Sequence, residues 1–316
     1  MSPEPITYVE HAQDVLGQAV ILAERGQQFA LISSVAIQGG TARELGSLAV
    51  VATDGTMTGY LSNGCIDSDI LANGMAALED GERRIVHYGA GSPFHDLTLP
   101  CGGMLKVLVD PKPDLHALAR AYEDFKNRRI AYLTFEADER LTIEYAPKPH
   151  LVLAGRGAIF RSTAQVAKTA GFQVECLSPE VSDLEALRPL CHGAPIHLKT
   201  QEMIPMLALD KWSAFLTLFH DHDWEPPLLL AAVKTDAAFV GALGSRPTHA
   251  ARIAALEAMG CAPDDIARIK GPVGLVPSLR SANLIAASII AELGAVFSRS
   301  QRRVEGVRSV GCTATG

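Results

Sequence analysis

The stretch HLVLAGRGAIFRSTAQVAKTAGFQVECLS, residues 150–178, decides the fold of the second half of the chain. It opens with an apolar run at 150–154, passes through a glycine-containing loop, and then repeats apolar residues at helical intervals over 158–170. Gly171 ends this helix, and 172–177 is again a short apolar run. A strand, a glycine loop, a helix and a second strand in this order predict a βαβ unit with parallel strands.

The alternation of strands and helices continues after residue 178. The expected strands are 194–198, 214–219 and 237–241, and the expected helices are 226–234, 247–259 and 284–297. Such alternation is typical of a doubly wound parallel sheet. We therefore expect a Rossmann-like C-terminal domain over residues 150–297.

The first half of the chain has a different pattern, which predicts an α+β domain. The expected elements are helices at 9–22, 66–78 and 115–125, strands at 29–37, 84–88 and 104–109, and hairpins at 47–60 and 129–145. Asp54-Gly55 suits the positive dihedral angles of a primed hairpin turn. Pro147 and Pro149 mark a linker, since two prolines favour an extended chain. This gives an N-terminal domain at 1–146, and the polar stretch 298–316 is expected to be a flexible tail.

Composition limits the class of protein. The chain has 316 residues, of which 48% are hydrophobic and 20% charged, with a formal net charge of −7. An acidic chain lacks the general attraction to phosphate backbones, so nucleic acid is not an expected partner. The polar, acidic start does not resemble a signal peptide, and no apolar run reaches the roughly 18–20 residues that span a bilayer. We expect a cytoplasmic protein whose six cysteines are reduced thiols, with no CxxC pair among them.

The loop Gly155-Arg156-Gly157 stands where dinucleotide-binding folds hold a phosphate. Glycine allows the sharp turn, the helix N-terminus offers unpaired N–H groups, and Arg156 has a guanidinium that pairs well with phosphate. Two residues depart from the dinucleotide pattern: Phe160 replaces the third glycine, and Ser178 stands where an acidic residue usually holds the ribose. A phosphate-bearing ligand and an inherited fold without a dinucleotide are both open interpretations.

Two cysteines lie in glycine-rich surroundings. Cys65 follows Gly64 just before a predicted helix, where the helix N-terminus favours thiolate. Cys101 precedes Gly102 and Gly103, which expose backbone N–H groups and allow a bulky ligand to approach. Thiolates bind soft metals and transfer sulfur, although a small buried core residue is the commoner use of a cysteine.

Two more segments end predicted strands of the C-terminal domain. His220-Asp221-His222-Asp223 follows an apolar strand and could bind a metal or act in acid–base chemistry, or form a polar loop with one functional histidine. Ser245-Arg246 precedes a helix, with Ser245 as the expected N-cap and Arg246 as the charge of a second anion site; an ordinary strand-to-helix turn is the alternative.

Taken together, these segments resemble the xanthine dehydrogenase accessory protein family, also called XdhC/CoxI-like. The matching blocks occur in the expected order along most of the chain: Gly40 to Arg43, Gly59 to Asp67, Pro100 to Gly103, His220 to Asp223, Gly241 to Thr248 with Arg252, Gly271 to Leu275, and Ala286 to Leu293. Asp67 departs from the glutamate usual in that family, and Ala282-Asn283 stand where Pro-Glu is common.

The resemblance implies a chaperone for molybdenum cofactor, in mono- or dinucleotide form, rather than a turnover enzyme. Such proteins support exchange of a metal oxo ligand for sulfur and deliver the cofactor to a xanthine dehydrogenase or aldehyde oxidase-type apoenzyme. Cys65 and Cys101 would lie at the cofactor, and Arg156, His220, Ser245 and Arg246 would hold its phosphate or nucleotide. The implied partners are an apo-molybdenum hydroxylase and a cysteine desulfurase, and the implied state is a homodimer. The rival functions are an NAD(P)-dependent oxidoreductase and a metal-dependent hydrolase built on His220 and His222.

Overall fold

The computed structural model describes residues 5–39, 43–89, 103–200, 204, 206–219 and 223–298, and the backbone of 302–305. The chain forms two compact units. One runs to Pro147 and includes the segment that starts at Arg302, and the other is Lys148–Gln301. The division falls inside the expected proline-rich linker. The mixed α/β class predicted from the sequence is confirmed.

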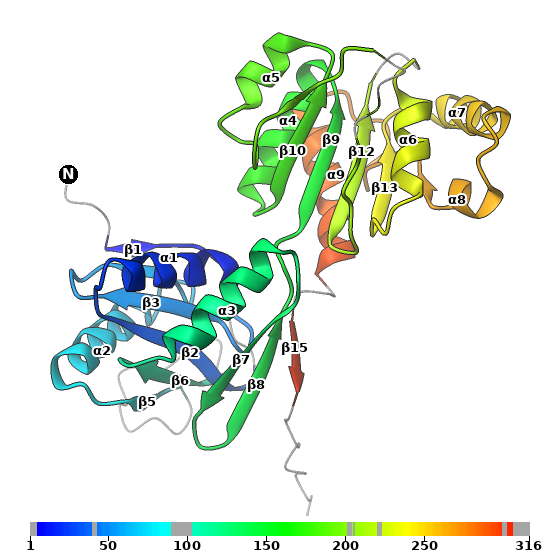
Figure 1. Cartoon of the computed structure of the whole chain (residues 1–316). Helices are drawn as coiled ribbons and strands as arrows, with labels where there is room; N and C mark the ends of the chain where they lie inside the picture. The colour runs from blue at the N-terminus through cyan, green and yellow to red at the C-terminus, as the bar shows by residue number, and fades with distance from the viewer. Residues whose placement is uncertain are drawn as a thin grey trace, which may run out of the picture. The chain divides into compact units, whose positions relative to one another are not determined.

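The C-terminal unit contains a six-stranded sheet whose described strands are all parallel (Figure 1). Its spatial order is β11 (Ile196–His197), β10 (Gln173–Ser178), β9 (His150–Gly155), β12 (Ser213–Leu218), β13 (Phe239–Ala242) and β14 (Ile269–Lys270). Numbered from β9, this is the 3-2-1-4-5-6 order of the Rossmann fold. The order reverses between β9 and β12, and ligands of such folds bind beyond the carboxyl ends of the strands.

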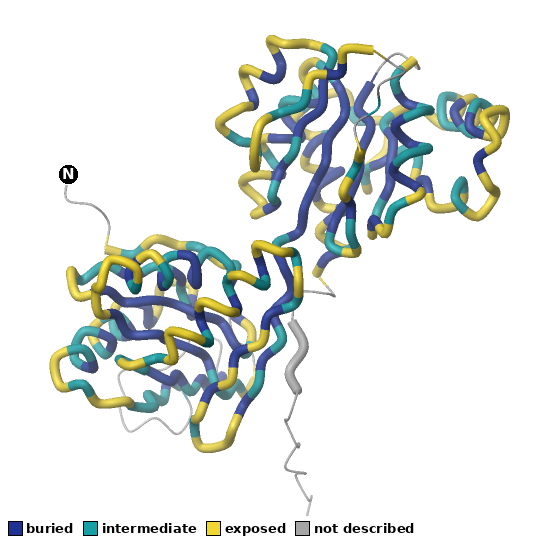
Figure 2. The backbone as a smooth tube through the Cα atoms, in the orientation of Figure 1, coloured by how far each residue is buried: buried dark blue, intermediate teal, exposed yellow. Residues whose placement is uncertain are grey.

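Helices cover both faces of this sheet. They are α4 (Gly157–Thr169), α5 (Val181–Leu187), α6 (Glu225–Val233), α7 (Arg246–Ala258), α8 (Pro263–Ala267) and α9 (Ala282–Phe297). Side chains of α4, α5 and α9 share one apolar cluster with Leu151 and Leu153 of β9, whereas α6 and α7 share another with Val152 and Ala154. Every residue of β9 is buried, which explains its unbroken apolar sequence (Figure 2).

The N-terminal unit is built on a second six-stranded sheet. Its order is β1 (Ile6–Thr7), β4 (Met57–Gly59), β3 (Leu48–Ala52), β2 (Phe29–Gln38), β6 (Met104–Asp110) and β5 (Arg84–Gly89). Helices α1 (Ala12–Glu24) and α3 (Leu115–Lys126) share a core with one face, and α2 (Asp67–Asp80) shares a core with the other. Both faces are therefore buried. No helix of the described residues is long and apolar enough to cross a membrane.

A small antiparallel sheet completes this unit. It consists of β7 (Ala131–Glu136), β8 (Arg140–Tyr145) and β15 (Arg302–Glu305), and β8 lies in the middle. Strand β15 belongs to the stretch that we expected to be a flexible tail. It returns to the N-terminal unit after the whole C-terminal unit has been traversed, and it pairs with β8 from Arg302 opposite Tyr145 to Glu305 opposite Thr142.

The β3–β4 hairpin is present, but the primed turn predicted for it is wrong. Within the turn only Gly55 has a positive φ, of 81°, whereas a type I′ turn would need two such residues. Gly55 N–H donates to the carbonyl of Ala52, and the Asp54 carboxylate accepts a hydrogen bond from Thr56 N–H. The loop is thus one residue longer than predicted and places glycine in the left-handed region.

Gly59, at the end of β4, provides a stability test. Its φ is 97°, and a Cβ there would lie 2.5 Å from the carbonyl oxygen of Leu48. We expect Gly59→Ala to destabilise the N-terminal unit by more than the roughly 1–2 kcal/mol of a left-handed alanine, because the clash adds to the dihedral cost. Gly26→Ala is the control, since Gly26 has a φ of 66° with nothing within 4 Å of the added Cβ. Equal urea midpoints for the two variants would contradict this account.

Candidate functional site

The Gly155-Arg156-Gly157 loop joins β9 to α4, as the sequence predicted. Gly155 is needed at a close approach of two strands, because a Cβ there would lie 2.8 Å from the carbonyl oxygen of Leu218. Gly157 has a φ of 79° and begins the helix. Phe160, in place of the third glycine, is fully buried in the core shared by α4 and α9. The loop therefore has the backbone conformation of a phosphate-binding loop, and Phe160 packs the first turn of the following helix into the core.

The position that would hold a phosphate is used by a carboxylate of the chain itself. The Gly157 N–H donates to Oδ2 of Asp183, at 2.7 Å, and Arg161 Nε donates to Oδ1, at 2.5 Å. Asp183 is 4% exposed and stands in the first turn of α5. A bound pyrophosphate would have to displace this buried carboxylate and then face its negative charge. The geometry thus disfavours the dinucleotide interpretation of the loop.

Arg156 and Ser178 also have partners within this region. The Arg156 guanidinium lies 3.5 Å from a carboxylate oxygen of Glu180. Ser178 is fully buried, and its hydroxyl accepts a hydrogen bond from the Glu180 N–H at 3.1 Å. Ser178 therefore shapes the turn after β10, where a dinucleotide-binding fold would present a ribose ligand.

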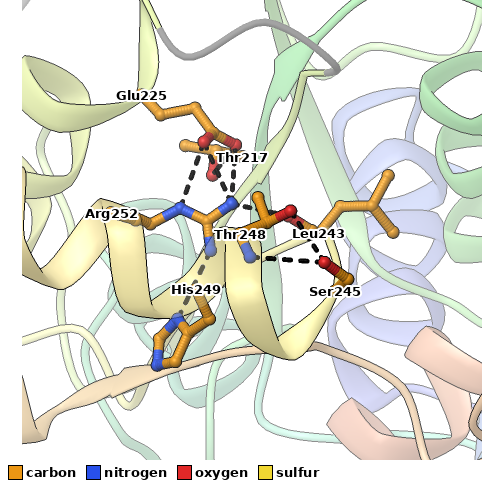
Figure 3. A network of polar contacts seen from close by, with 7 residues as sticks. All are labelled: Thr217, Glu225, Leu243, Ser245, Thr248, His249 and Arg252. Carbon is orange, nitrogen blue, oxygen red and sulfur yellow. Dashed lines mark hydrogen bonds and ion pairs between the residues drawn. The ribbon is translucent and has the colours of Figure 1, made fainter.

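A buried ion pair fixes the loop between β13 and α7, residues 243–245 (Figure 3). Glu225 of α6 and Arg252 of α7 are each 1% exposed at the side chain, and Arg252 Nη2 lies 3.0 Å from Oε2 of Glu225. The same nitrogen donates to the carbonyl of Leu243 at 2.6 Å, and Thr217 of β12 donates to Glu225 at 3.2 Å. The Arg252 guanidinium thus connects α7 to α6 and to the loop, and Glu225 connects this pair to β12.

The end of this loop is organised by Ser245 and His249. Ser245 caps α7, as predicted, because its hydroxyl accepts the Thr248 N–H at 3.2 Å. Burial, with a smaller contribution from the positive charge of Arg252, holds the pKa of His249 below its ordinary value. The neutral ring can accept from Arg252 Nη1, which lies 3.3 Å from Nδ1. Arg246, next to the cap, is exposed.

A cleft of about 640 Å³ opens at this edge of the Rossmann sheet. Ser245 and Arg246 lie on one wall, and residues 272–279 form the other wall, after β14. Helix α9 holds the second wall in place. Ser288 Oγ accepts the Val276 N–H at 2.8 Å, and Glu292 accepts the Gly274 N–H at 2.6 Å. The spacing of Ser288 and Glu292 by one helical turn is what places both acceptors on this loop.

In the N-terminal unit, Cys65 lies exposed in a loop that Asp67 organises. The Asp67 carboxylate is 1% exposed and accepts three backbone N–H groups, from Leu61 at 3.1 Å and from Ser62 and Gly64 at 3.0 Å each. Asp67 thus has a structural use: it closes the turn that presents Cys65 ahead of α2.

The start of this loop is held by Arg43. Its side chain is 7% exposed, lies 2.5 Å from a carboxylate oxygen of Glu10, and places its guanidinium carbon 4.3 Å from the centre of the Tyr60 ring. The cation–π contact connects Arg43 to the residue after β4, and the ion pair connects it to Glu10, ahead of α1.

Four of the predicted site residues lie outside the described residues: Cys101, Gly102, His220 and His222. Gly103 is buried immediately before β6. Among the residues that the structure does describe, no group of three metal-ligating side chains occurs.

The sequence interpretation missed Asp183, Glu225 and Glu292. Asp183 and Glu225 are single acidic residues without a motif, whereas Glu292 lies in the Ala286 to Leu293 block but received no role. Each acts on a partner that is 18 to 27 positions away along the chain. Glu225 also carried a usable signal, since it follows Trp224 and precedes two prolines at a helix start.

The buried pair of Glu225 and Arg252 predicts strong coupling. Arg252→Met should destabilise the C-terminal unit by about 3–5 kcal/mol, because it leaves a buried carboxylate without its cation. The double variant with Glu225→Leu should recover most of this loss, as measured by chemical denaturation. Lys126→Met is the control, since its ion pair is more than half exposed and its loss should change stability little. A double variant no more stable than Arg252→Met would contradict the coupling.

The Asp183 carboxylate predicts that dinucleotides do not bind. We expect NADH and NADPH to leave the melting temperature of the wild-type protein unchanged, since a ligand must bind the folded state to raise it. Inorganic pyrophosphate, measured in parallel, controls for anion binding elsewhere. A concentration-dependent rise with NADH, but not with pyrophosphate, would show that the loop accepts a dinucleotide after all.

Comparison with known proteins agrees with both halves of this architecture. Residues 151–293 match the model of the XdhC Rossmann domain, and residues 22–89 match that of the XdhC and CoxI family. The molybdenum cofactor insertion chaperone PaoD of Escherichia coli (strain K12) is 27% identical over 311 residues, which cover 93% of this chain and 91% of PaoD.

Two further similarities extend over most of the chain. The uncharacterized protein YqeB of Escherichia coli (strain K12) is 24% identical over 89% of this chain, and the match spans 46% of YqeB. A crystal structure from Bacillus halodurans, described as a xanthine dehydrogenase, has a TM-score of 0.75 at 19% identity and covers 92% of this chain and 97% of its own. It shows a shared fold. From the two family models and the architecture they describe, the chain belongs to the XdhC and CoxI family.

Proposed function

We propose that this protein binds molybdenum cofactor as cargo, supports its sulfuration and inserts it into a molybdenum hydroxylase of the xanthine dehydrogenase or aldehyde oxidase type. The name of the relative PaoD, an insertion chaperone for this cofactor, supports the general role. The observation that carries the proposal here is the exposed thiol of Cys65, on a turn that the Asp67 carboxylate holds in shape.

Strand register supports a shared edge of the N-terminal sheet for the segments that carry the two cysteines. Gly59 pairs with Ala49 near the end of β4, and Gln38 pairs with Met104, where β2 ends and β6 begins. The carboxyl ends of β4 and β2 therefore point to the same edge as the start of β6. In the sequence, Cys65 lies six residues after Gly59, and Cys101 lies three residues before Met104. Gly59 is level with Val109 of β6, five residues past Met104, so the two strand ends are offset along the strands and are also three strands apart. The strand register therefore supports a common edge, and residues 60–64 and 102–103 would bring the two thiols to the same cargo molecule.

The chemistry of this edge suits the cargo. Thiolates coordinate soft metal centres and take part in sulfur transfer. Cys65 is exposed on a turn whose amides are already bonded to Asp67, so the turn is preformed. Gly64, Gly102 and Gly103 add little bulk beside the two thiols, which allows a large pterin to approach. The cysteines would meet the metal end of the cofactor.

The phosphate or nucleotide end of the cargo fits the cleft of the Rossmann sheet better than its glycine loop. Ser245 and Arg246 line a space of about 640 Å³ at the carboxyl edge of the strands, and Arg246 is an exposed cation. By contrast, the N-terminus of α4 already holds Asp183. Arg156 and His220 remain candidate contacts, and Gly155 and Gly157 act by shaping the loop. An NAD(P)-dependent oxidoreductase is disfavoured for the same reason.

An apo-molybdenum hydroxylase is the partner that such a carrier requires. A cysteine desulfurase would supply the sulfur, and a homodimer is the expected state. In this role the protein releases its cargo unchanged or sulfurated, and it is not a turnover enzyme for a metabolite.

Molybdopterin binding tests the proposal. Purified protein should retain the cofactor under reducing, anaerobic conditions, as detected by fluorescence of the oxidised pterin after separation. Cys101→Ala and Cys65→Ala should each weaken retention, because each removes a thiolate from the proposed metal end. Cys261→Ala is the matched control, since Cys261 is a buried thiol of the other unit.

The possible results separate the parts of the proposal. Retention that weakens only in the Cys65 and Cys101 variants would support the thiol edge. Equal retention by all variants would keep a carrier role but contradict the thiol site. No retention by the wild type would contradict the carrier role itself.

A further inference from the structure

Two cysteines of the C-terminal unit belong to the same apolar cluster. Cys176 is fully buried near the end of β10. Cys191 follows α5 and forms a parallel bridge with Val174 of the same strand. The His192 N–H donates to the Val174 carbonyl at 2.7 Å, which fixes this segment beside β10.

The strand period places both thiols on one face of the sheet. Val174 and Cys176 are two residues apart, so their side chains point the same way, and the bridged Cys191 shares that face. Cys191 packs as a partly buried residue against the core cluster that contains Cys176. Among the residues described, this is the place where two cysteines meet; Cys65 belongs to the other unit, and Cys261 belongs to a different cluster.

The two thiols differ in reactivity. A hydrogen bond from the Cys176 thiol lowers the pKa of Cys191, with a smaller favourable contribution from Lys168 against the opposing effect of burial. The same hydrogen bond, followed by burial, raises the pKa of Cys176 far above its ordinary value. Cys191 is partly exposed, whereas Cys176 is not. Cys191 thus has the character of an attacking thiolate and Cys176 that of a thiol reached only from within.

We propose that Cys176 and Cys191 form an oxidation site that reacts with peroxides to give a reversible intramolecular disulfide. The Cys191 thiolate attacks one oxygen of hydrogen peroxide, forming an S–O bond and breaking the O–O bond, and the departing hydroxide takes a proton to become water. The Cys176 sulfur, on losing its proton, then attacks the sulfenic acid of Cys191. The S–O bond breaks, a second water leaves, and the two thiols have lost two electrons to the peroxide.

The disulfide would connect β10 to the segment after α5. Its β10 end, Cys176, lies two residues before Ser178. This inference is independent of cofactor binding, since it concerns residues outside both proposed contacts of the cargo.

The test treats the folded wild-type chain with limiting hydrogen peroxide, alkylates the remaining thiols after denaturation, and maps the peptides by mass spectrometry. The expected result is a cross-linked Cys176–Cys191 peptide that disappears on treatment with dithiothreitol. Cys261→Ser is the matched control. It should give the same cross-link, because Cys261 is buried in a different cluster from Cys176 and Cys191.

Two variants identify the order of reaction. In Cys176→Ser, Cys191 should stop at the sulfenic acid, which dimedone traps. In Cys191→Ser, Cys176 should remain fully alkylatable, because no attacking thiolate is left beside it. The proposal is overturned if wild-type Cys191 oxidises while Cys176 stays alkylatable, or if both stay alkylatable after exposed Cys65 has reacted completely. The wild-type map decides the question even if a serine variant fails to fold.

Discussion

The carboxylate of Asp67 accepts three backbone N–H groups, and those of Asp183 and Glu292 accept one each at the turns they support. A buried carboxylate is costly unless its oxygens are satisfied, so each of these residues fixes its loop in the one arrangement that satisfies it. The turn before α2, the loop before α4 and the loop at residues 272–279 each depend on such an acceptor. The shapes of the Cys65 turn, the glycine loop and the cleft wall are consequences of where these acids are buried.

The same interaction decides how the Rossmann fold is used here. Strand order and the Gly155 turn are those of a dinucleotide-binding fold, yet the amide at the start of α4 bonds to Asp183. The strand order of the fold is thus unchanged, while the amide that would bind a phosphate bonds to a side chain of the protein itself. The open space lies further along the strand ends, beside Ser245 and Arg246. Fold and ligand are separable properties, as this pair of sites in one sheet illustrates.

Local pattern predicted most of the secondary structure. The apolar runs at β9, β10 and β12 and the helical spacing of α4 are local signals, and the elements begin and end within a few residues of expectation. The site was less predictable, because its contacts are not local. Gly157 and Asp183 are 26 residues apart, and Glu225 and Arg252 are 27 apart. Short elements such as α8 and β14 were missed because they carry too few residues for any period to show. Cys191 could not be recognised without knowing that it lies beside β10.

Strand β15 is synthesised much later than the two strands with which it forms the small sheet. A growing polypeptide leaves the ribosome from its N-terminus, so β7 and β8 exist long before residues 302–305 have been made. The edge of β8 that β15 covers must wait while the entire C-terminal unit is synthesised. During that interval β8 presents an open strand edge, the kind of surface on which nascent chains associate wrongly. The first unit to begin folding is therefore the last to be finished.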